Sequence, residues 1–200
     1  AIPGARDDHS CVVHEETMVL FGGFNDGERC NFVHKYEFLN GRWTEVKTRG
    51  EPPCPRANHS ATIRGDDMII YGGTDEDNVR LYDTWLFNCM RNEWHRLDIP
   101  NEVDTIPRCG HSASIYDDRY MLVFGGIHKV TKELDDVAVL DLKEKTWITL
   151  TQAKDIQSIL RKKTSEMRKS QPAISRTEEK QMSQTETQRT PKELDKSPYL

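Results

Sequence analysis

The chain of 200 residues lacks the patterns by which disulfide frameworks, zinc sites and membrane spans are usually recognised. Its five cysteines are odd in number, and no two are spaced as Cys-x-x-Cys, so we expect neither a disulfide framework nor a zinc site. No apolar run approaches the length of about eighteen residues that a membrane helix requires. These absences favour a reducing compartment, and we expect the cytoplasm, with the nucleus as the alternative.

The chain also lacks a basic surplus over most of its length. The net charge is −5, but residues 1–150 hold 17 Lys and Arg against 26 Asp and Glu, a net charge of −9. Residues 151–200 hold 11 against 7, a net charge of +4. Because nucleic acid is bound by basic surfaces, the acidic body predicts a protein that does not bind nucleic acid.

Residues 151–200 contain no Gly, Cys, Phe or Trp and are rich in Thr, Ser, Gln, Glu and Lys. Such a segment cannot bury enough apolar surface to offset the entropy of ordering it, so we expect a polar, basic, disordered tail. Its apolar residues over 152–169 approximate one helical face, which leaves a short helix or a solvated linker as alternatives there. The expected domains are therefore residues 1–150 and 151–200.

What residues 1–150 do contain is a repeat. A block Arg-x-x-His-Ser, a pair of glycines after an apolar run, and a later tryptophan recur together three times, in steps of 50 to 53 residues. The markers are Arg6, His9, Gly22, Gly23 and Trp43; Arg56, His59, Gly72, Gly73 and Trp94; and Arg108, His111, Gly125, Gly126 and Trp147. A period of about 50 residues is typical of propeller blades.

Each unit also contains the signals of four strands. In the second unit, the run from Ser60 to Ile63 and the run from Met68 to Tyr71 flank the turn residues Gly65-Asp66-Asp67, which predicts a β-hairpin. Two further short strands complete a unit, as with Thr84 to Asn88 and Glu93 to Leu97 in the second unit. We therefore predict an all-β fold of three four-stranded antiparallel sheets, with repeats at about 6–50, 56–100 and 108–150.

These residues resemble the Kelch repeat family. The resemblance rests on the doubled glycine after an apolar strand and on an aromatic residue seven positions before the tryptophan, as in Tyr36 with Trp43 and Phe87 with Trp94. The third unit departs, because Leu140 stands seven positions before Trp147. The Arg-x-x-His-Ser blocks look most like the Rab-effector, host-cell-factor and cell-end-marker type. The resemblance implies a β-propeller with the hairpin after each His-Ser nearest the central axis.

Three repeats are too few for a closed propeller, which needs at least about four blades. An open array leaves two apolar faces without a neighbouring blade. Three expectations follow: the chain is a fragment of a longer protein, it associates with another copy through its open blade edges, or it is marginally stable. The fragment is the interpretation that we favour.

The loops after the glycine pairs are the predicted protein-binding site, because they vary between units while the strands do not. Their candidate contact residues are Asn25, Asp26, Arg29, Asp75, Asp77, Arg80, His128, Lys129 and Lys132. The recurring histidines are expected to satisfy backbone groups, and the recurring arginines to tie neighbouring blades together. The tryptophans are expected in the core.

The sequence predicts no catalytic residue, no cofactor and no metal ligand. We expect a non-catalytic scaffold that presents its loops to a protein partner of unknown identity. The alternative is a substrate-recognition or accessory part of a larger enzyme complex, such as a ubiquitin-ligase receptor or a Kelch phosphatase. A metal-dependent enzyme is disfavoured, since the Glu-x3-Asp-x3-His pattern of iron-using specifier proteins on this fold does not occur.

Overall fold

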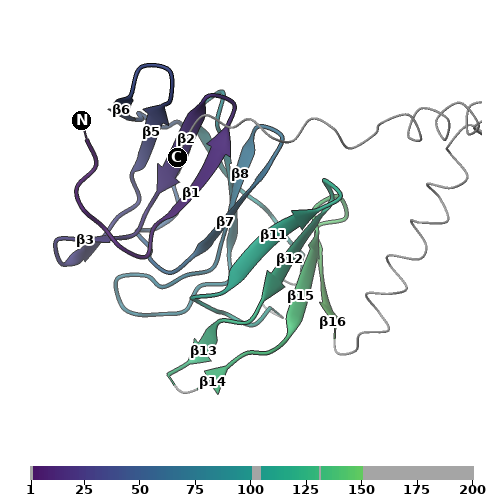
Figure 1. Cartoon of the computed structure of the whole chain (residues 1–200). Helices are drawn as coiled ribbons and strands as arrows, with labels where there is room; N and C mark the ends of the chain where they lie inside the picture. Colours follow the sequence, from purple (N-terminus) through teal and green to yellow (C-terminus); the bar gives the residue numbers. More distant parts are fainter. Residues whose placement is uncertain (1, 101–104, 131, 151–200) are drawn as a thin grey trace, which may run out of the picture. The chain divides into compact units, whose positions relative to one another are not determined.

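The computed structural model describes residues 2–100, 105–130 and 132–150 of the chain. In these residues the regular structure is entirely strands, which form three four-stranded antiparallel sheets and two small two-stranded ones, and none of the four-stranded sheets closes on itself (Figure 1). The all-β fold of blades from an incomplete propeller is thus confirmed. The basic tail, with its alternative helix over 152–169, lies outside the described residues.

Each sheet joins its strands in chain order, so the chain runs up and down across it. The first sheet consists of β1 (Ser10–His14), β2 (Thr17–Phe21), β5 (Val33–Glu37) and β6 (Arg42–Glu45). The second consists of β7 (Ser60–Arg64), β8 (Asp67–Tyr71), β9 (Thr84–Asn88) and β10 (Glu93–Arg96). The third consists of β11 (Ser112–Tyr116), β12 (Tyr120–Phe124), β15 (Val137–Asp141) and β16 (Thr146–Leu150).

Two small hairpins that the sequence did not predict lie between the second and third strands of a sheet. They pair β3 (Phe24–Asn25) with β4 (Glu28–Arg29), and β13 (Ile127–Lys129) with β14 (Lys132–Glu133).

Strand register explains the seven-residue spacing to each tryptophan. Trp43 lies opposite Tyr36, Trp94 opposite Phe87, and Trp147 opposite Leu140, each as a cross-strand pair of the last two strands. Side chains opposite each other in an antiparallel pair point to the same face and touch. Leu140 keeps this register without an aromatic ring, so the third unit departs in sequence and not in fold.

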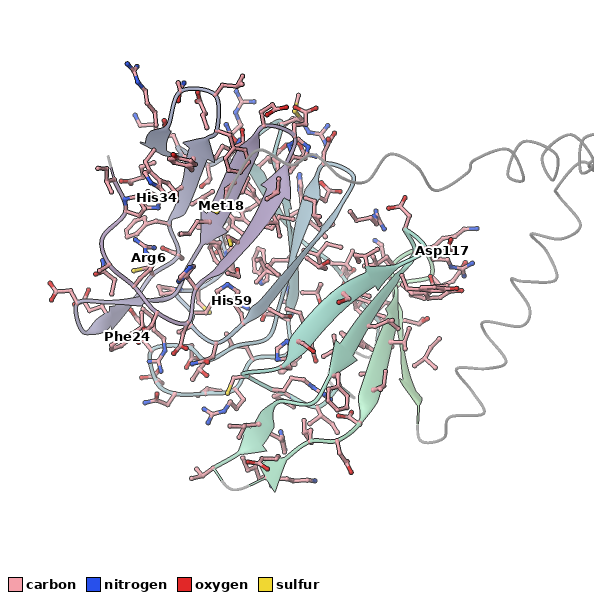
Figure 2. All side chains as sticks on the ribbon, viewed as in Figure 1. Arg6, Met18, Phe24, His34, His59 and Asp117 are labelled. Atoms are coloured by element: carbon pink, nitrogen blue, oxygen red, sulfur yellow. The ribbon has the colours of Figure 1, made fainter. Side chains whose placement is uncertain are left out.

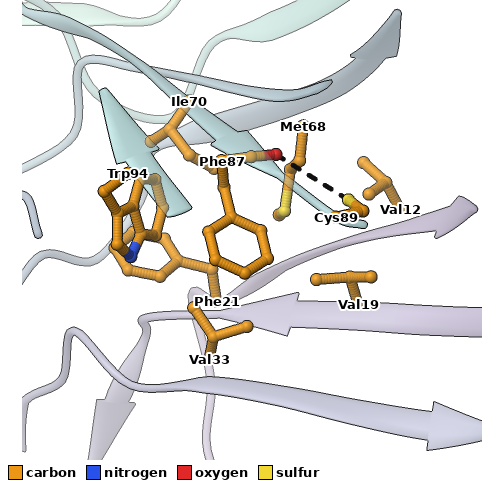
Figure 3. Packing of buried hydrophobic residues seen from close by; sticks show 9 residues of the cluster. All are labelled: Val12, Val19, Phe21, Val33, Met68, Ile70, Phe87, Cys89 and Trp94. Carbon is orange, nitrogen blue, oxygen red and sulfur yellow. Dashed lines mark hydrogen bonds between the residues drawn. The ribbon is translucent and has the colours of Figure 1, made fainter. Parts of the chain in front are cut away.

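The apolar core lies between sheets. One cluster joins Val19 and Phe21 of the first sheet to Met68, Phe87 and Trp94 of the second (Figure 3). A second cluster joins Ile69 and Tyr71 of the second sheet to the third. Since successive side chains of β8 point to opposite faces, one strand contributes to both clusters. Of the three tryptophans expected in the core, only Trp94 is buried; Trp43 and Trp147 are half-buried.

The glycine pairs let neighbouring chain segments approach closely. Gly72 has a φ of +62°, and a Cβ there would lie 2.7 Å from the carbonyl oxygen of Arg108, in the segment that leads into the third sheet. Gly73 has a φ of +100°, and its Cβ would lie 2.8 Å from the carbonyl oxygen of Ala57 in its own repeat. The first glycine therefore serves packing between repeats, and the second serves packing within one.

The histidines link neighbouring sheets through side chains. A hydrogen bond of 2.6 Å joins Ser10 Oγ to His59 Nε2, and one of 2.8 Å joins Ser60 Oγ to His111 Nε2. The side-chain partner of His59 and of His111 is thus a serine hydroxyl of the preceding repeat, and His111 also has a hydrogen bond with the backbone of Tyr71, the kind of partner that the sequence suggested. Burial, with the Arg56 guanidinium as the next cause, lowers the pKa of His59 to about 3. Burial, with Arg108 as the next cause, lowers the pKa of His111 to about 4.

Glycine substitutions test the close approach. We expect Gly72→Ala to lower the free energy of unfolding of the full chain by about 2–3 kcal/mol, from backbone strain and the clash with Arg108. Gly65→Ala is the matched control, because Gly65 has a φ of +54° with nothing within 4 Å of its Cβ position. Equal losses in urea unfolding would show that only the φ angle matters.

The buried histidines predict a loss of stability in mild acid. Their folded pKa values lie below the ordinary value of about 6.5, so the unfolded chain binds more protons and stability falls as the pH drops below 6.5. Each should contribute a loss of about 2 kcal/mol by pH 5. Urea titrations from pH 7 to pH 5 should show His59→Gln with a shallower dependence than the parent. His95→Gln, at an exposed position, should match the parent; an unchanged slope in His59→Gln would contradict the assignment.

Candidate functional site

Three loops connect the second and third strands of the sheets, and we call them together the rim. They comprise residues 24–29, 74–80 and 127–133, of which residue 131 is not described. Because strands alternate in direction, all three loops lie at the same end of their sheets, as Figure 1 shows for β3, β13 and β14. In Figure 2, Phe24 lies at this end of its sheet, and Asp117 lies in a turn at the other end of the third sheet.

A buried arginine holds the base of the second loop. Arg56 is 0% exposed, and its Nη1 donates to the carbonyl oxygen of Gly72 at 3.1 Å, where the loop begins. Its Nη1 and Nη2 also donate to the two carboxylate oxygens of Asp83, at 2.8 and 2.9 Å, where the loop ends. Such a bidentate contact fixes both distance and orientation. One guanidinium therefore clamps both ends of the loop.

The third loop has the same clamp. Arg108 donates to the carbonyl oxygen of Gly125 at 2.9 Å and to the Asp136 carboxylate at 2.9 and 2.8 Å. Hydrogen bonds from Arg108 lower the pKa of Asp136. Burial alone would raise the pKa of Asp83, but the hydrogen bonds and charge of Arg56 outweigh burial and lower it. Both carboxylates are thus held in the charged form that the clamp requires.

The same arginines reach the preceding repeat through their backbones. The carbonyl oxygen of Arg56 accepts from Gly23 N–H, and that of Arg108 accepts from Gly73 N–H, each at 2.9 Å. The arginines therefore join neighbouring blades, as expected, but they do so through their backbones. Their side chains bind groups of their own repeat.

The first loop lacks half of this clamp. Arg6 donates to the carbonyl oxygen of Gly22 at 3.0 Å, as its counterparts do. At the position of Asp83 and Asp136, however, the first repeat has Phe32, whose carbonyl oxygen accepts from Gly22 N–H. The first loop is held instead by its own hairpin and by a contact with the second loop.

Within the first loop, Asp26 and Gly27 form the tight turn between β3 and β4, with φ angles of +52° and +89°. Positive φ at both central residues is the geometry that Asp-Gly turns favour. Arg29 extends its Nη2 to Asn78 Oδ1 of the second loop at 2.7 Å. Of the three predicted contact residues, Asp26 is exposed, Asn25 is half-buried in the hairpin, and Arg29 connects two loops.

In the second loop, Asp75 has a structural role. Its Oδ1 accepts from the N–H groups of Asp77 and Val79, at 3.1 and 2.8 Å, and so shapes the loop. Arg80 donates to the carbonyl oxygen of Asn78 at 3.0 Å. Asp77 is exposed, so it is the better candidate for a contact residue here.

In the third loop, His128 is half-buried, and a hydrogen bond of 2.8 Å joins its Nδ1 to the carbonyl oxygen of Pro107. Lys129 and Lys132 are exposed in β13 and β14. The predicted set thus divides into exposed charges (Asp26, Asp77, Lys129 and Lys132) and residues that shape or join the loops. The structure brings Arg29 together with the second loop and places Lys129 opposite Lys132 in the β13–β14 hairpin.

Apolar side chains on the rim were missed by the sequence analysis. Phe24 is partly exposed beneath the Arg29 guanidinium, Val79 is exposed, and Val130 is 91% exposed. A signal existed, since each is an apolar residue in a loop made mostly of polar residues. Asn78, the partner of Arg29, carried no signal, because a contact between loops 49 residues apart is not visible in sequence.

The described part of the chain contains no cluster of three or more His, Cys, Asp or Glu side chains arranged to hold a metal ion. No helix among those residues is long and apolar enough to cross a membrane.

The clamp predicts a large effect of one carboxylate. Asp136→Asn should lower the free energy of unfolding by about 2–4 kcal/mol, because the buried Arg108 loses its counter-charge. Asp135→Asn, at the neighbouring exposed residue, should change it by less than about 0.5 kcal/mol. Urea unfolding of both variants measures the difference, and similar values would show that the clamp contributes little.

Comparison with known proteins gives a consistent family. Residues 1–171 match the KLHDC2/KLHL20/DRC7 Kelch-repeats domain. An F-box/kelch-repeat protein of Arabidopsis thaliana is 34% identical over 163 residues, covering 74% of this chain and 34% of that protein. Kelch domain-containing protein 3 of Bos taurus is 32% identical, covering 73% and 41%, and acyl-CoA-binding domain-containing protein 5 of Arabidopsis thaliana is 31% identical, covering 74% and 22%. The chain therefore spans less than half the length of these curated relatives.

Proposed function

The chain belongs to the Kelch-repeat family, and we propose that it is a non-catalytic scaffold whose rim binds a protein partner. The observation that carries the proposal is the contrast between the base and the tips of the rim loops. Two bases are clamped by the same kind of Arg–Asp pair, while the tips differ in sequence and charge. A rigid base with variable tips is the usual arrangement of a recognition surface.

The rim has the mixed chemistry of a protein-binding surface. Exposed acidic side chains, Asp26 and Asp77, stand on the first two loops, and exposed lysines, Lys129 and Lys132, stand on the third. Phe24, Val79 and Val130 add apolar contact area between the charges. Surfaces that bind proteins combine apolar anchors with charges that set orientation and partner choice.

A second candidate is a substrate-recognition or accessory part of a larger enzyme complex, such as a ubiquitin-ligase receptor or a Kelch phosphatase. The names of two relatives favour it: one is an F-box/kelch-repeat protein, and another is Rho GTPase-activating protein gacHH of Dictyostelium discoideum. The match covers 9% of the length of the latter protein. Kelch repeats there are one part of a longer chain. An F-box, BTB or phosphatase segment in the same reading frame would favour this candidate.

The proposal includes a reducing compartment, the cytoplasm or the nucleus. All five cysteines are free thiols, and Cys30, Cys89 and Cys109 are buried. Burial, the largest cause, raises the pKa of Cys89 to about 11, which keeps that thiol protonated and unreactive.

The rim can be tested by reversing its exposed charges. We expect the variant Asp77→Lys/Lys129→Glu to lose, by at least tenfold, the proteins that the parent chain captures from cell extract, as measured by quantitative mass spectrometry. The variant Glu16→Lys/Lys143→Glu, with the same exchange of charge at exposed turns of the opposite end, should retain them. Partners kept by the rim variant, or lost equally from both, would contradict the proposal.

A further inference from the structure

The two interfaces between neighbouring sheets repeat the same contacts. At the first, the Phe21 ring lies 5.3 Å from the His59 ring and 4.8 Å from the Trp94 ring of the next repeat, measured between ring centroids. At the second, Tyr71 lies 5.1 Å from His111 and 4.8 Å from Trp147. Each interface thus has a first half, an aromatic ring and a serine, and a second half, a histidine and a tryptophan.

The third sheet has the aromatic ring and the serine of such an interface, but among the described residues no histidine and tryptophan pack against them. Phe124 lies opposite Ser112, in the register in which Phe21 lies opposite Ser10 and Tyr71 opposite Ser60. Phe21 and Tyr71 are 0% exposed, but Phe124 is 55% exposed, and Ser112 is exposed.

The surroundings of Gly125 also differ from those of the equivalent glycines in the first two repeats. It has a φ of +68°, like its counterparts, yet among the described residues a Cβ there would meet the Leu134 carbonyl oxygen of its own loop, at 3.2 Å, and no atom of a following repeat. The corresponding Cβ positions at Gly22 and Gly72 meet the arginine carbonyl and the histidine ring of the following repeat. Space for a further Arg-x-x-His segment is therefore open beside Gly125.

The first sheet has the histidine and the tryptophan of such an interface, but among the described residues no aromatic ring and serine of a preceding sheet pack against them. His9 is exposed, whereas its counterparts His59 and His111 are buried. Among the described residues, the aromatic partner of Trp43 is Tyr36 of its own sheet, at 5.1 Å between ring centroids. Val13 is 57% exposed, and it points to the face opposite the buried Val12. The same face includes Met18, which is half-buried, and His34, which is buried, both labelled in Figure 2.

We propose that the open face of the third sheet binds the open face of the first sheet of a second copy, so that two chains form one closed ring of six sheets. In each interface, Phe124 and Ser112 of one copy would contact Trp43 and His9 of the other. The occupant is a second copy because this chain carries both complementary halves, one at each end of its row of sheets. A head-to-tail contact of this kind repeats until the rotation closes, and six sheets fall within the range of about four to eight blades in closed propellers.

The proposal is tested by the mass of the full chain in solution. Light scattering and sedimentation over a hundredfold range of concentration should give the mass of two chains for the parent. Phe124→Ser and His9→Ala should each weaken association by at least tenfold and give the one-chain mass at concentrations where the parent is a dimer. Both residues are exposed in the single chain, so each variant should keep a cooperative melt at high dilution. Leu39→Ser, at an exposed residue of the turn between β5 and β6, should behave as the parent does.

Mixing the two variants separates a head-to-tail contact from a symmetric one. One interface of the mixed pair has both halves intact, so the mixture should associate more tightly than either variant alone. A one-chain mass for the parent at every concentration would overturn the proposal and leave the open faces to further repeats of a longer protein. A dimer that persists in both variants, or that is lost only when residues 151–200 are removed, would overturn it as well, because another surface would then join the copies.

Discussion

The arginine that opens each repeat is the contact on which the rest of the structure depends. The backbone of Arg56 pairs with the preceding repeat, and its buried side chain binds the glycine carbonyl and the carboxylate of its own repeat. A buried guanidinium is tolerated only when its charge and its donors are matched, so the second and third repeats each present a carbonyl oxygen and a carboxylate at fixed places. The same arginine therefore joins neighbouring sheets through its backbone and fixes the position of a loop through its side chain.

The sequence was sufficient for the fold because its signals are local and repeated. The glycine pair, the turn at Gly65-Asp66-Asp67 and the spacing to Trp94 each follow from backbone geometry or cross-strand register within one repeat. Three independent copies of each signal reinforce one another. The predicted strands therefore agree with the structure to within one or two residues.

Contacts between repeats were harder to predict. Ser10 with His59 and Arg29 with Asn78 join residues 49 apart, and no local pattern relates them. The same limit explains why Asp75 was predicted as a contact residue, although it shapes its own loop. Whether a polar loop residue faces solvent or supports the loop is decided by backbone geometry that composition does not reveal.

The phenylalanine at position 32 has a consequence for how the structure opens. Where the other repeats close the base of the loop with a carboxylate, the first repeat has an exposed ring and an arginine that holds one end of the loop. Local openings begin where the fewest buried contacts must break. Backbone amides around the first loop should therefore exchange with solvent sooner than their equivalents in the second repeat. Local unfolding of the row of sheets should accordingly begin at the first sheet.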